Sequence, residues 1–190
     1  MPEDHAATAP ELAVSVKDLG RRPGTAKELS ISFEAPGGLG TDVIAVPAGS
    51  PVGLELRLES VLEGVLATGA VQAEAVGECA RCLGQVRLPL EATFQELFVY
   101  PERAEAARGA GKAVDGDQPA VVFDVVDLNS PVRDAVVLAL PFGPLCRDDC
   151  PGLCADCGAR LADDEAHGHR VVDARWAALE DLLEDEREEK

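Results

Sequence analysis

The sequence predicts an α+β fold: an antiparallel, β-rich domain with a long hairpin and one packed helix, followed by a cysteine-rich segment and a terminal helix. Two observations lead to this prediction. Apolar residues alternate with polar or small ones along several runs, which is typical of half-buried strands. Four of the six cysteines then fall between positions 146 and 157, where Pro151 and Gly152 argue against a continuous helix.

The composition allows one domain with a small appendage. The chain has 190 residues, of which 46% are hydrophobic and only 4% aromatic, so the core must consist mainly of Val, Leu and Ala. We expect a disordered tail over 1–10 and a β-rich domain over 11–145 with a mobile insertion at about 101–119. A cysteine-rich segment then covers 146–172, and a helix with a frayed acidic end covers 173–190.

The first expected strands are short and are separated by turn residues. Apolar alternation predicts strands around 12–16 and 29–33, and a further short strand at 42–46. Gly20–Gly24 and Pro36–Gly38 carry the Gly and Pro residues typical of turns.

The most regular alternation lies between residues 52 and 98. It is strict over 52–58, continues over 71–77 and resumes over 86–98. The last two runs flank the short segment CARCLG, which contains Cys79 and Cys82. This arrangement predicts a β-hairpin with both cysteines at its tip.

Helices are expected only in the last third of the chain. A short strand at 121–126 precedes a helix in which Ser130 is the expected N-cap and Pro131 the first helical residue. This helix should stop at Pro141. The terminal helix over 173–190 carries an apolar stripe of Trp176, Leu179, Leu182 and Leu183.

Charge and hydropathy exclude several classes of protein. No apolar run approaches the roughly 18 to 20 residues of a membrane helix, and the acidic start of the chain lacks a signal pattern, so we expect a cytoplasmic protein that does not bind membranes. The formal net charge is −18. Such a chain repels bare RNA, so a basic protein is the expected direct partner. The sequence does not indicate an oligomeric state.

The cysteines and histidines indicate metal binding. In a reducing compartment, paired cysteines are more often metal ligands or redox centres than disulfides. Zinc prefers four ligands in a tetrahedron, and structural sites often combine two short-range pairs. Eight candidate ligands would complete two structural Zn²⁺ sites and make residues 146–172 a zinc-knuckle segment. They are Cys79, Cys82, Cys146, Cys150, Cys154, Cys157, His167 and His169.

Two arrangements of these ligands are open. In the first, Cys146 and Cys150 join Cys79 and Cys82 at the hairpin tip, and the remaining cysteines bind a second ion together with the histidines. In the second, the four clustered cysteines form one site, and Cys79 and Cys82 bind with the histidines. We favour the first, because Cys154 and Cys157 lie close in sequence to both histidines and can close a local loop.

Other uses of the thiols fit less well. A redox CxxC of the thioredoxin type begins a helix in a βαβ unit, whereas Cys79 and Cys82 lie between expected antiparallel strands. A catalytic zinc keeps an open coordination position, and no HExxH pattern is present. Phosphate-binding loops and a GxSxG elbow are also absent from the sequence. We therefore expect a protein that is not an enzyme.

Several short motifs, in this order, resemble one known family. They are CARCL at 79–83, FQELF at 94–98, VVLALPFGPLC at 136–146, GLCADCGARL at 152–161 and DARWAAL at 173–179. Together they resemble the YceD family, the large ribosomal RNA subunit accumulation proteins, over roughly residues 12 to 185.

The resemblance bears on the candidate ligands, because the family's motifs can be compared with them residue by residue. Members of the family generally retain the first CxxC and a pair that matches Cys146 and Cys150. The second CxxC and a later C-x-C occur in some branches, and here His167 and His169 replace that C-x-C. Ala174 replaces the proline that is usual in the last motif.

The resemblance implies a non-enzymatic ribosome-biogenesis factor that supports accumulation of large-subunit (23S) rRNA. Its expected partner is a basic ribosomal protein or a large-subunit assembly intermediate. The alternative is a zinc- or redox-responsive regulatory protein.

Overall fold

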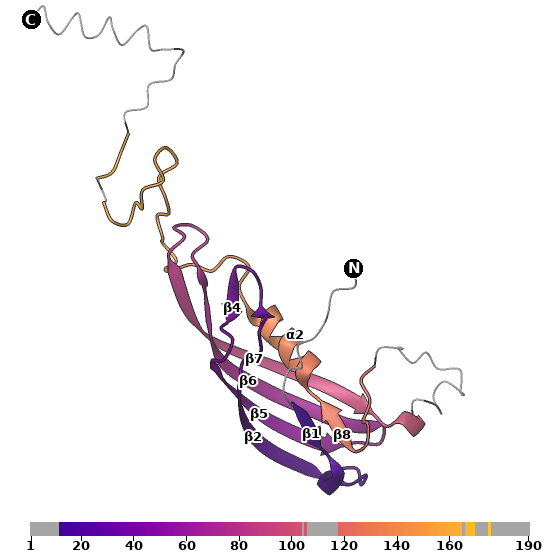
Figure 1. Cartoon of the computed structure of the whole chain (residues 1–190). Helices are drawn as coiled ribbons and strands as arrows, with labels where there is room; N and C mark the ends of the chain where they lie inside the picture. The colour runs from indigo at the N-terminus through magenta and orange to yellow at the C-terminus, as the bar shows by residue number, and fades with distance from the viewer. Residues whose placement is uncertain (1–11, 104, 106–117, 165, 170–174, 176–190) are drawn as a thin grey trace, which may run out of the picture. The chain divides into compact units, whose positions relative to one another are not determined.

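The computed structural model describes residues 12–103, 105, 118–164, 166–169 and 175 (Figure 1). The chain divides into two compact units, Met1–Cys146 and Arg147–Lys190. In the first unit a curved, mostly antiparallel six-stranded sheet lies against one helix, α2 (Asn129–Ala139). The six strands are β2 (Ala26–Glu34), β3 (Leu39–Gly40), β4 (Ile44–Val46), β5 (Pro51–Ser60), β6 (Gly64–Glu78) and β7 (Gln85–Val99).

The long strand β6 is the centre of this sheet. It pairs along its full length with β7, from Gly64 opposite Val99 to Glu78 opposite Gln85. Along its other edge β6 pairs first with β5 and then, near its C-terminal end, with β4, where Ile44 lies opposite Gly77. Strand β2 pairs with the outer side of β5 without interruption.

The buried positions of these strands are the apolar positions of the alternating pattern in the sequence. In β5, all four apolar positions of the alternating run are at most 2% exposed, whereas their neighbours face outward. The same face continues through β6 and β7. The buried set from these three strands includes Val52, Leu54, Leu56, Leu58, Val65, Ala67, Val71, Ala75, Leu90, Ala92 and Phe98. Apolar burial of this extent is the main force that holds such a sheet together.

Helix α2 covers this core and contacts β7, β3 and β6. It buries Val132 and Val136, and it ends at Ala139, before Pro141, as the sequence predicts. A second, two-stranded sheet joins β1 (Ala13–Ser15) to β8 (Val125–Asp127), and a short 3-10 helix, η1 (Lys17–Leu19), follows β1.

The prediction of one strand over 121–126 is wrong. Val122 and Val125 form an isolated antiparallel bridge around a tight turn, and only residues from Val125 onward enter β8. The two turn residues, Phe123 and Asp124, have φ values of 51° and 57°. Apolar β-formers at both ends of this segment gave a strand signal, but left-handed backbone at two consecutive positions reverses the chain.

The predicted start of α2 is also wrong. The helix begins at Asn129, and no side chain caps it from the N-cap position, Leu128. Instead, the Asp127 carboxylate accepts a bond from the Asn129 amide at 2.9 Å and another from the Asn129 side chain at 2.6 Å. Because Asp127 satisfies this amide from outside the helix, the helix can start before Ser130.

Three other predictions concern residues outside the described part of the chain. The tail over 1–10 lies wholly outside it, and of the helix over 173–190 only residue 175 is described. Of the insertion at about 101–119, residues 101–103, 105, 118 and 119 are described, and the first four of these are helical. Among the described helices, none is long and apolar enough to cross a membrane.

Candidate metal centres

The eight candidate ligands form two groups of four. Cys79, Cys82, Cys146 and Cys150 make up the first group, and Cys154, Cys157, His167 and His169 the second. Within each group the ligand atoms lie within 4.8 Å of one another. These are the two sets of the first arrangement that the sequence allows; the four clustered cysteines do not form one set.

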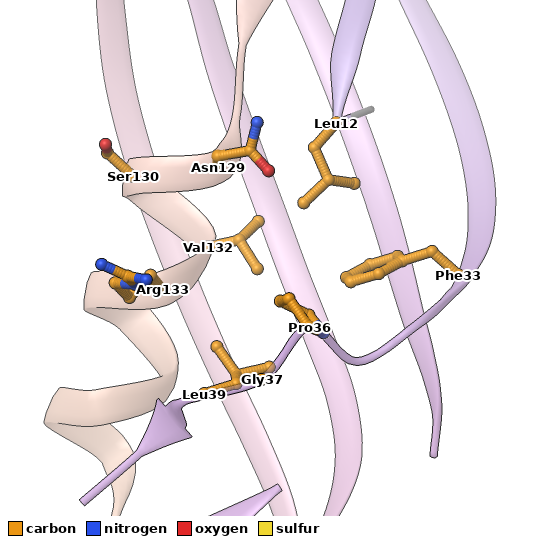
Figure 2. A pocket seen from close by; sticks show the side chains of 9 residues that line it. All are labelled: Leu12, Phe33, Pro36, Gly37, Leu39, Asn129, Ser130, Val132 and Arg133. Carbon is orange, nitrogen blue, oxygen red and sulfur yellow. The ribbon is translucent and has the colours of Figure 1, made fainter. Parts of the chain in front are cut away.

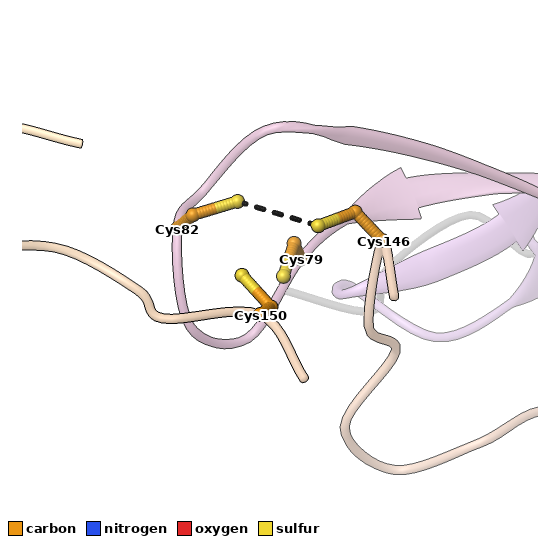
Figure 3. Close-up of side chains that lie close together, drawn as sticks. All are labelled: Cys79, Cys82, Cys146 and Cys150. Atoms are coloured by element: carbon orange, nitrogen blue, oxygen red, sulfur yellow. Dashed lines mark hydrogen bonds between the residues drawn. The ribbon is translucent and has the colours of Figure 1, made fainter. Parts of the chain in front are cut away.

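The first group, which we call the four-thiol cluster, has the spacing of a tetrahedral site (Figure 3). The sulfur atoms of Cys82 and Cys146 lie 3.8 Å apart. A tetrahedron with Zn–S bonds of about 2.3 Å has edges of about 3.8 Å. None of these four cysteines forms a disulfide, and Cys79, Cys82 and Cys150 are buried. Convergent, buried thiols at this spacing are suited to a closed structural metal site.

The sheet positions two of these thiols. Cys79 directly follows β6, and the residues between the strands form a turn in which the Cys79 amide donates to the Gly84 carbonyl at 2.7 Å. The amide of the next residue, Ala80, donates to the Pro144 carbonyl at 2.8 Å. The turn is therefore bonded to the segment that carries Cys146.

Backbone amides favour the deprotonated form of the Cys79 thiol. Amides of Cys146 and Cys82 donate to its sulfur and lower the pKa of the thiol to about 6. A thiol must lose its proton to bind zinc, so these bonds favour the ligand form of the side chain.

The second group, which we call the Cys-His cluster, belongs to the loop segment after Pro151. The Nε2 atoms of His167 and His169 lie 3.0 Å apart, and each lies close to the Cys157 sulfur, at 3.3 Å and 3.1 Å. The two rings meet edge to face at 78°. Cys157 and His169 are exposed, whereas Cys154 and His167 are partly buried. Two thiols and two imidazoles form a common structural zinc set.

The two CxxC turns have the same backbone geometry. In the Cys-His cluster the Cys154 amide donates to the Ala159 carbonyl at 2.8 Å, and the Gly158 amide donates to the Cys154 carbonyl at 2.9 Å. The Cys79 turn has the same two bonds at the same residue offsets: its amide donates to Gly84, and its carbonyl accepts from the Leu83 amide at 2.9 Å. Amides of Cys157 and Asp156 likewise lower the pKa of the Cys154 thiol to about 6.

Residue type alone indicates the candidate ligands, but it did not indicate the residues that shape each turn. The residue after each CxxC has left-handed backbone, with φ of 55° at Leu83 and 73° at Gly158. Gly84 and Gly158 near the end of each motif were the available signal, since glycine is typical of such turns.

Comparison with known proteins identifies the family. The family model described as "Large ribosomal RNA subunit accumulation protein YceD" matches residues 67–183. The chain belongs to the YceD family. The matched range includes all eight candidate ligands.

Relatives that match nearly the whole chain occur in mycobacteria. Uncharacterized proteins of Mycobacterium tuberculosis (strain ATCC 25618 / H37Rv) and Mycobacterium bovis are each 43% identical over 189 residues, covering 96% of this chain and 89% of the relative. An uncharacterized protein of Mycobacterium leprae is 40% identical over 168 residues, covering 88% of this chain and 76% of the relative. No solved structure gives a significant match.

Proposed function

We propose that this YceD-family protein is a non-enzymatic factor in biogenesis of the large ribosomal subunit, and that it supports accumulation of 23S rRNA. The observation that carries this proposal is the family match over residues 67–183. The description of that family names accumulation of the large ribosomal RNA subunit.

In this proposal both clusters hold structural Zn²⁺. Zinc at the four-thiol cluster would cross-link the β6–β7 connection to the segment that follows α2. Structural zinc contributes on the order of 10 kcal/mol of folding free energy in small peptides. This contribution would support a domain that contains few aromatic residues. The support for zinc is the convergence of the ligand atoms within 4.8 Å in each cluster.

The proposed partner is a basic ribosomal protein or a large-subunit assembly intermediate in the cytoplasm. The net charge of −18 supports this choice, since it opposes contact with bare RNA and attracts a cationic protein.

Deletion of the gene tests the role in the ribosome. We expect a sucrose gradient of the deletion strain to show fewer large subunits and more 23S precursor, and we expect the wild-type gene to restore both. A normal ribosome profile in the deletion strain would contradict the proposal. Elemental analysis of the purified protein tests the metal: close to two zinc ions per chain are expected for two four-ligand sites, and near zero would exclude both.

A zinc- or redox-responsive regulator is the second candidate. The exposure of Cys157 and His169 in the Cys-His cluster favours it, because exposed thiols exchange metal and react with oxidants more readily than buried ones. A deletion strain with normal ribosomes but altered tolerance of zinc or oxidants would support this candidate over the first.

A further inference from the structure

Strand β2 forms a long open edge of the main sheet. Its nine residues pair with β5 on one side, and no strand in the described part of the chain pairs with the other side. The pairing with β5 has no bulge, and β2 contains no proline. Proteins usually protect an edge of this length with prolines, bulges, covering elements or charged side chains, because an open edge can accept another strand. Of these, β2 has charged side chains, on Lys27, Glu28 and Glu34.

The register defines which backbone groups of β2 are open. At the two ends of the ladder, the Ala35 amide donates to the Ser50 carbonyl at 2.8 Å, and the Ser60 amide donates to the Thr25 carbonyl at 2.9 Å. In an antiparallel pair, residues that bond to the partner strand alternate with residues whose N–H and C=O groups point away from it. The outward set is therefore Ala26, Glu28, Ser30, Ser32 and Glu34.

A row of apolar side chains follows the same edge. Leu29, Ile31 and Phe33 are only partly buried, although they pack against the core. At the end of the row, Phe33 lines a cavity of about 180 Å³, with Leu12 and Val132 opposite it (Figure 2). A strand added beside β2 would cover this row, and the cavity has room for one further side chain.

The opposite edge of the sheet is protected. Strand β7 contains Pro89, which has no amide proton to donate, and α2 packs against this strand. At its far end, the Val99 backbone bonds to Pro119 and Val121. Strand β2 has neither a proline nor an α-helix packed against it among the described residues, so β2 is the edge better able to accept an added strand.

The charged side chains beside the β2 edge indicate which kind of partner binds to it. The outward face of β2 and β5 carries four carboxylates, on Glu28, Glu34, Glu55 and Glu59. Arg57 lies within 3.1 Å of Glu28 and 3.4 Å of Glu59, whereas no ion pair with Glu34 or Glu55 occurs among the described residues. We propose that β2 is an interaction surface that accepts an extended segment of a partner protein as an added strand, in which Lys or Arg residues alternate with apolar residues.

A second copy of this chain is a poorer occupant. Two β2 edges side by side would bring together their glutamates, and each chain has a net charge of −18. Like charges on neighbouring strands destabilise the pair. The inference deepens the proposed function by assigning a binding surface to its basic partner.

Binding of synthetic peptides to the purified full chain tests the surface. The probe is a peptide as long as β2 in which Lys or Arg alternates with Val or Ile, and the control peptide has the same composition with its apolar residues consecutive. We expect only the alternating peptide to slow amide hydrogen exchange at Glu28, Ser30 and Ser32. Exchange along β7 should not change. Protection elsewhere, or equal binding of both peptides, would overturn the proposal.

Two variants at position 32 separate the contribution of the backbone amide to peptide binding from that of the side chain. Ser32→Pro removes an outward amide, which an edge strand tolerates, whereas Ser32→Ala retains it. We expect Ser32→Pro to weaken binding at least about tenfold and Ser32→Ala to bind like wild type. Should Ser32→Pro fold poorly, Glu34→Lys leaves the backbone intact and should also weaken binding. If folded Ser32→Pro or Glu34→Lys bound the peptide as tightly as wild type, the proposal would be overturned, as it would by a dimer joined through β2.

The peptide assay is independent of the ribosome. If peptides fail to bind while the deletion strain lacks large subunits, the surface is excluded and the proposed function stands. If peptides bind as expected while ribosomes are normal, the surface stands and the proposed function does not.

Discussion

The Leu83 amide donates a hydrogen bond to the Cys79 carbonyl oxygen at 2.9 Å, and Leu83 itself has left-handed backbone, with φ of 55°. Gly158 makes the same bond to Cys154 at the same distance, with φ of 73°. One turn geometry therefore carries a leucine in the four-thiol cluster and a glycine in the Cys-His cluster. Left-handed backbone costs an ordinary L-residue roughly 1–2 kcal/mol, and glycine avoids most of this cost.

Leu83→Gly should therefore stabilise the protein. The Leu83 side chain is 59% exposed, so its removal sacrifices little burial. We expect a gain of about 1 kcal/mol in the free energy of unfolding, measured with urea. Leu83→Ala is the control, because it removes the side chain but keeps a Cβ atom at positive φ. A gain of the same size in Leu83→Ala would refute the backbone explanation.

The reverse substitution, Gly158→Ala, should weaken the Cys-His cluster. Alanine at φ of 73° would cost about 1 kcal/mol, although no atom outside the turn obstructs its Cβ. We expect about a fivefold loss of zinc affinity at this site in competition with a chelator. Unchanged affinity would show that the turn does not limit binding.

Serine substitutions should separate the two clusters. Cys79 is fully buried at the end of β6, so Cys79→Ser should remove one zinc ion and lower the free energy of unfolding of the sheet unit by at least about 3 kcal/mol. Cys154→Ser should also remove one zinc ion, but it should leave unfolding of the sheet unit within about 0.5 kcal/mol of wild type. Both quantities can be measured by elemental analysis and urea unfolding. Two zinc ions in either variant would exclude that cysteine as a ligand.

The Cys154 thiol should react at unusually low pH in the metal-free protein. Its pKa is lowered to about 6 by the amides of Cys157 and Asp156, compared with about 8.5 for a free cysteine. Because the thiolate is the nucleophile, alkylation at Cys154 should rise through pH 6 and level off above it. The stabilisation that the thiolate gives the folded loop is complete above about pH 8.5 and is lost as the pH falls through 6.

The same chain in urea provides the control for this measurement. There the loop amides no longer bond to the sulfur, so half-maximal alkylation should return to about pH 8.5. Identical profiles for the folded and unfolded chains would show that the loop does not lower the pKa.

The parts of the fold predicted from sequence are those with strong periodicity. Alternation over 52–58 and 86–98 gave the buried faces of β5 and β7, because both strands have one face on the core. The path of the chain at 121–126 was not predictable in this way. Its reversal depends on left-handed backbone at Phe123 and Asp124, and phenylalanine is not among the Gly, Asn and Asp residues that usually mark such a turn.

The candidate site was more accessible to prediction than the turns that support it. Candidate ligands follow from residue type and count, so the sequence indicated the eight side chains that the structure places in two groups, and the shorter separation favoured the grouping that the structure has. The amide bonds to Cys79 could not be predicted. One of them comes from Cys146, which is distant in sequence and lies two residues after Pro144, the residue whose carbonyl accepts the Ala80 amide bond.

Asp127, rather than Ser130, should stabilise the start of α2. The Asp127 carboxylate accepts the Asn129 amide bond at 2.9 Å, whereas no hydrogen bond from the Ser130 side chain occurs among the described residues. We expect Asp127→Ala to lower the free energy of unfolding by about 1 kcal/mol and Ser130→Ala to change it by less than about 0.5 kcal/mol. Urea unfolding of the two variants measures both. The opposite order would mean that Ser130 caps the helix in solution.

Gly77 should not tolerate a side chain, because β4 lies too close to it. A Cβ atom at Gly77 would lie 2.5 Å from the Val43 carbonyl oxygen and 2.7 Å from the Ile44 Cβ. Relief of this overlap requires β4 to move, so we expect Gly77→Ala to lower the free energy of unfolding by about 1–3 kcal/mol. Gly53 is the matched control, since its nearest atom would be 3.9 Å away. Gly53→Ala should be neutral or slightly stabilising, because alanine restricts the unfolded chain. Equal stability of the two variants in urea would contradict the close packing of β4 against β6.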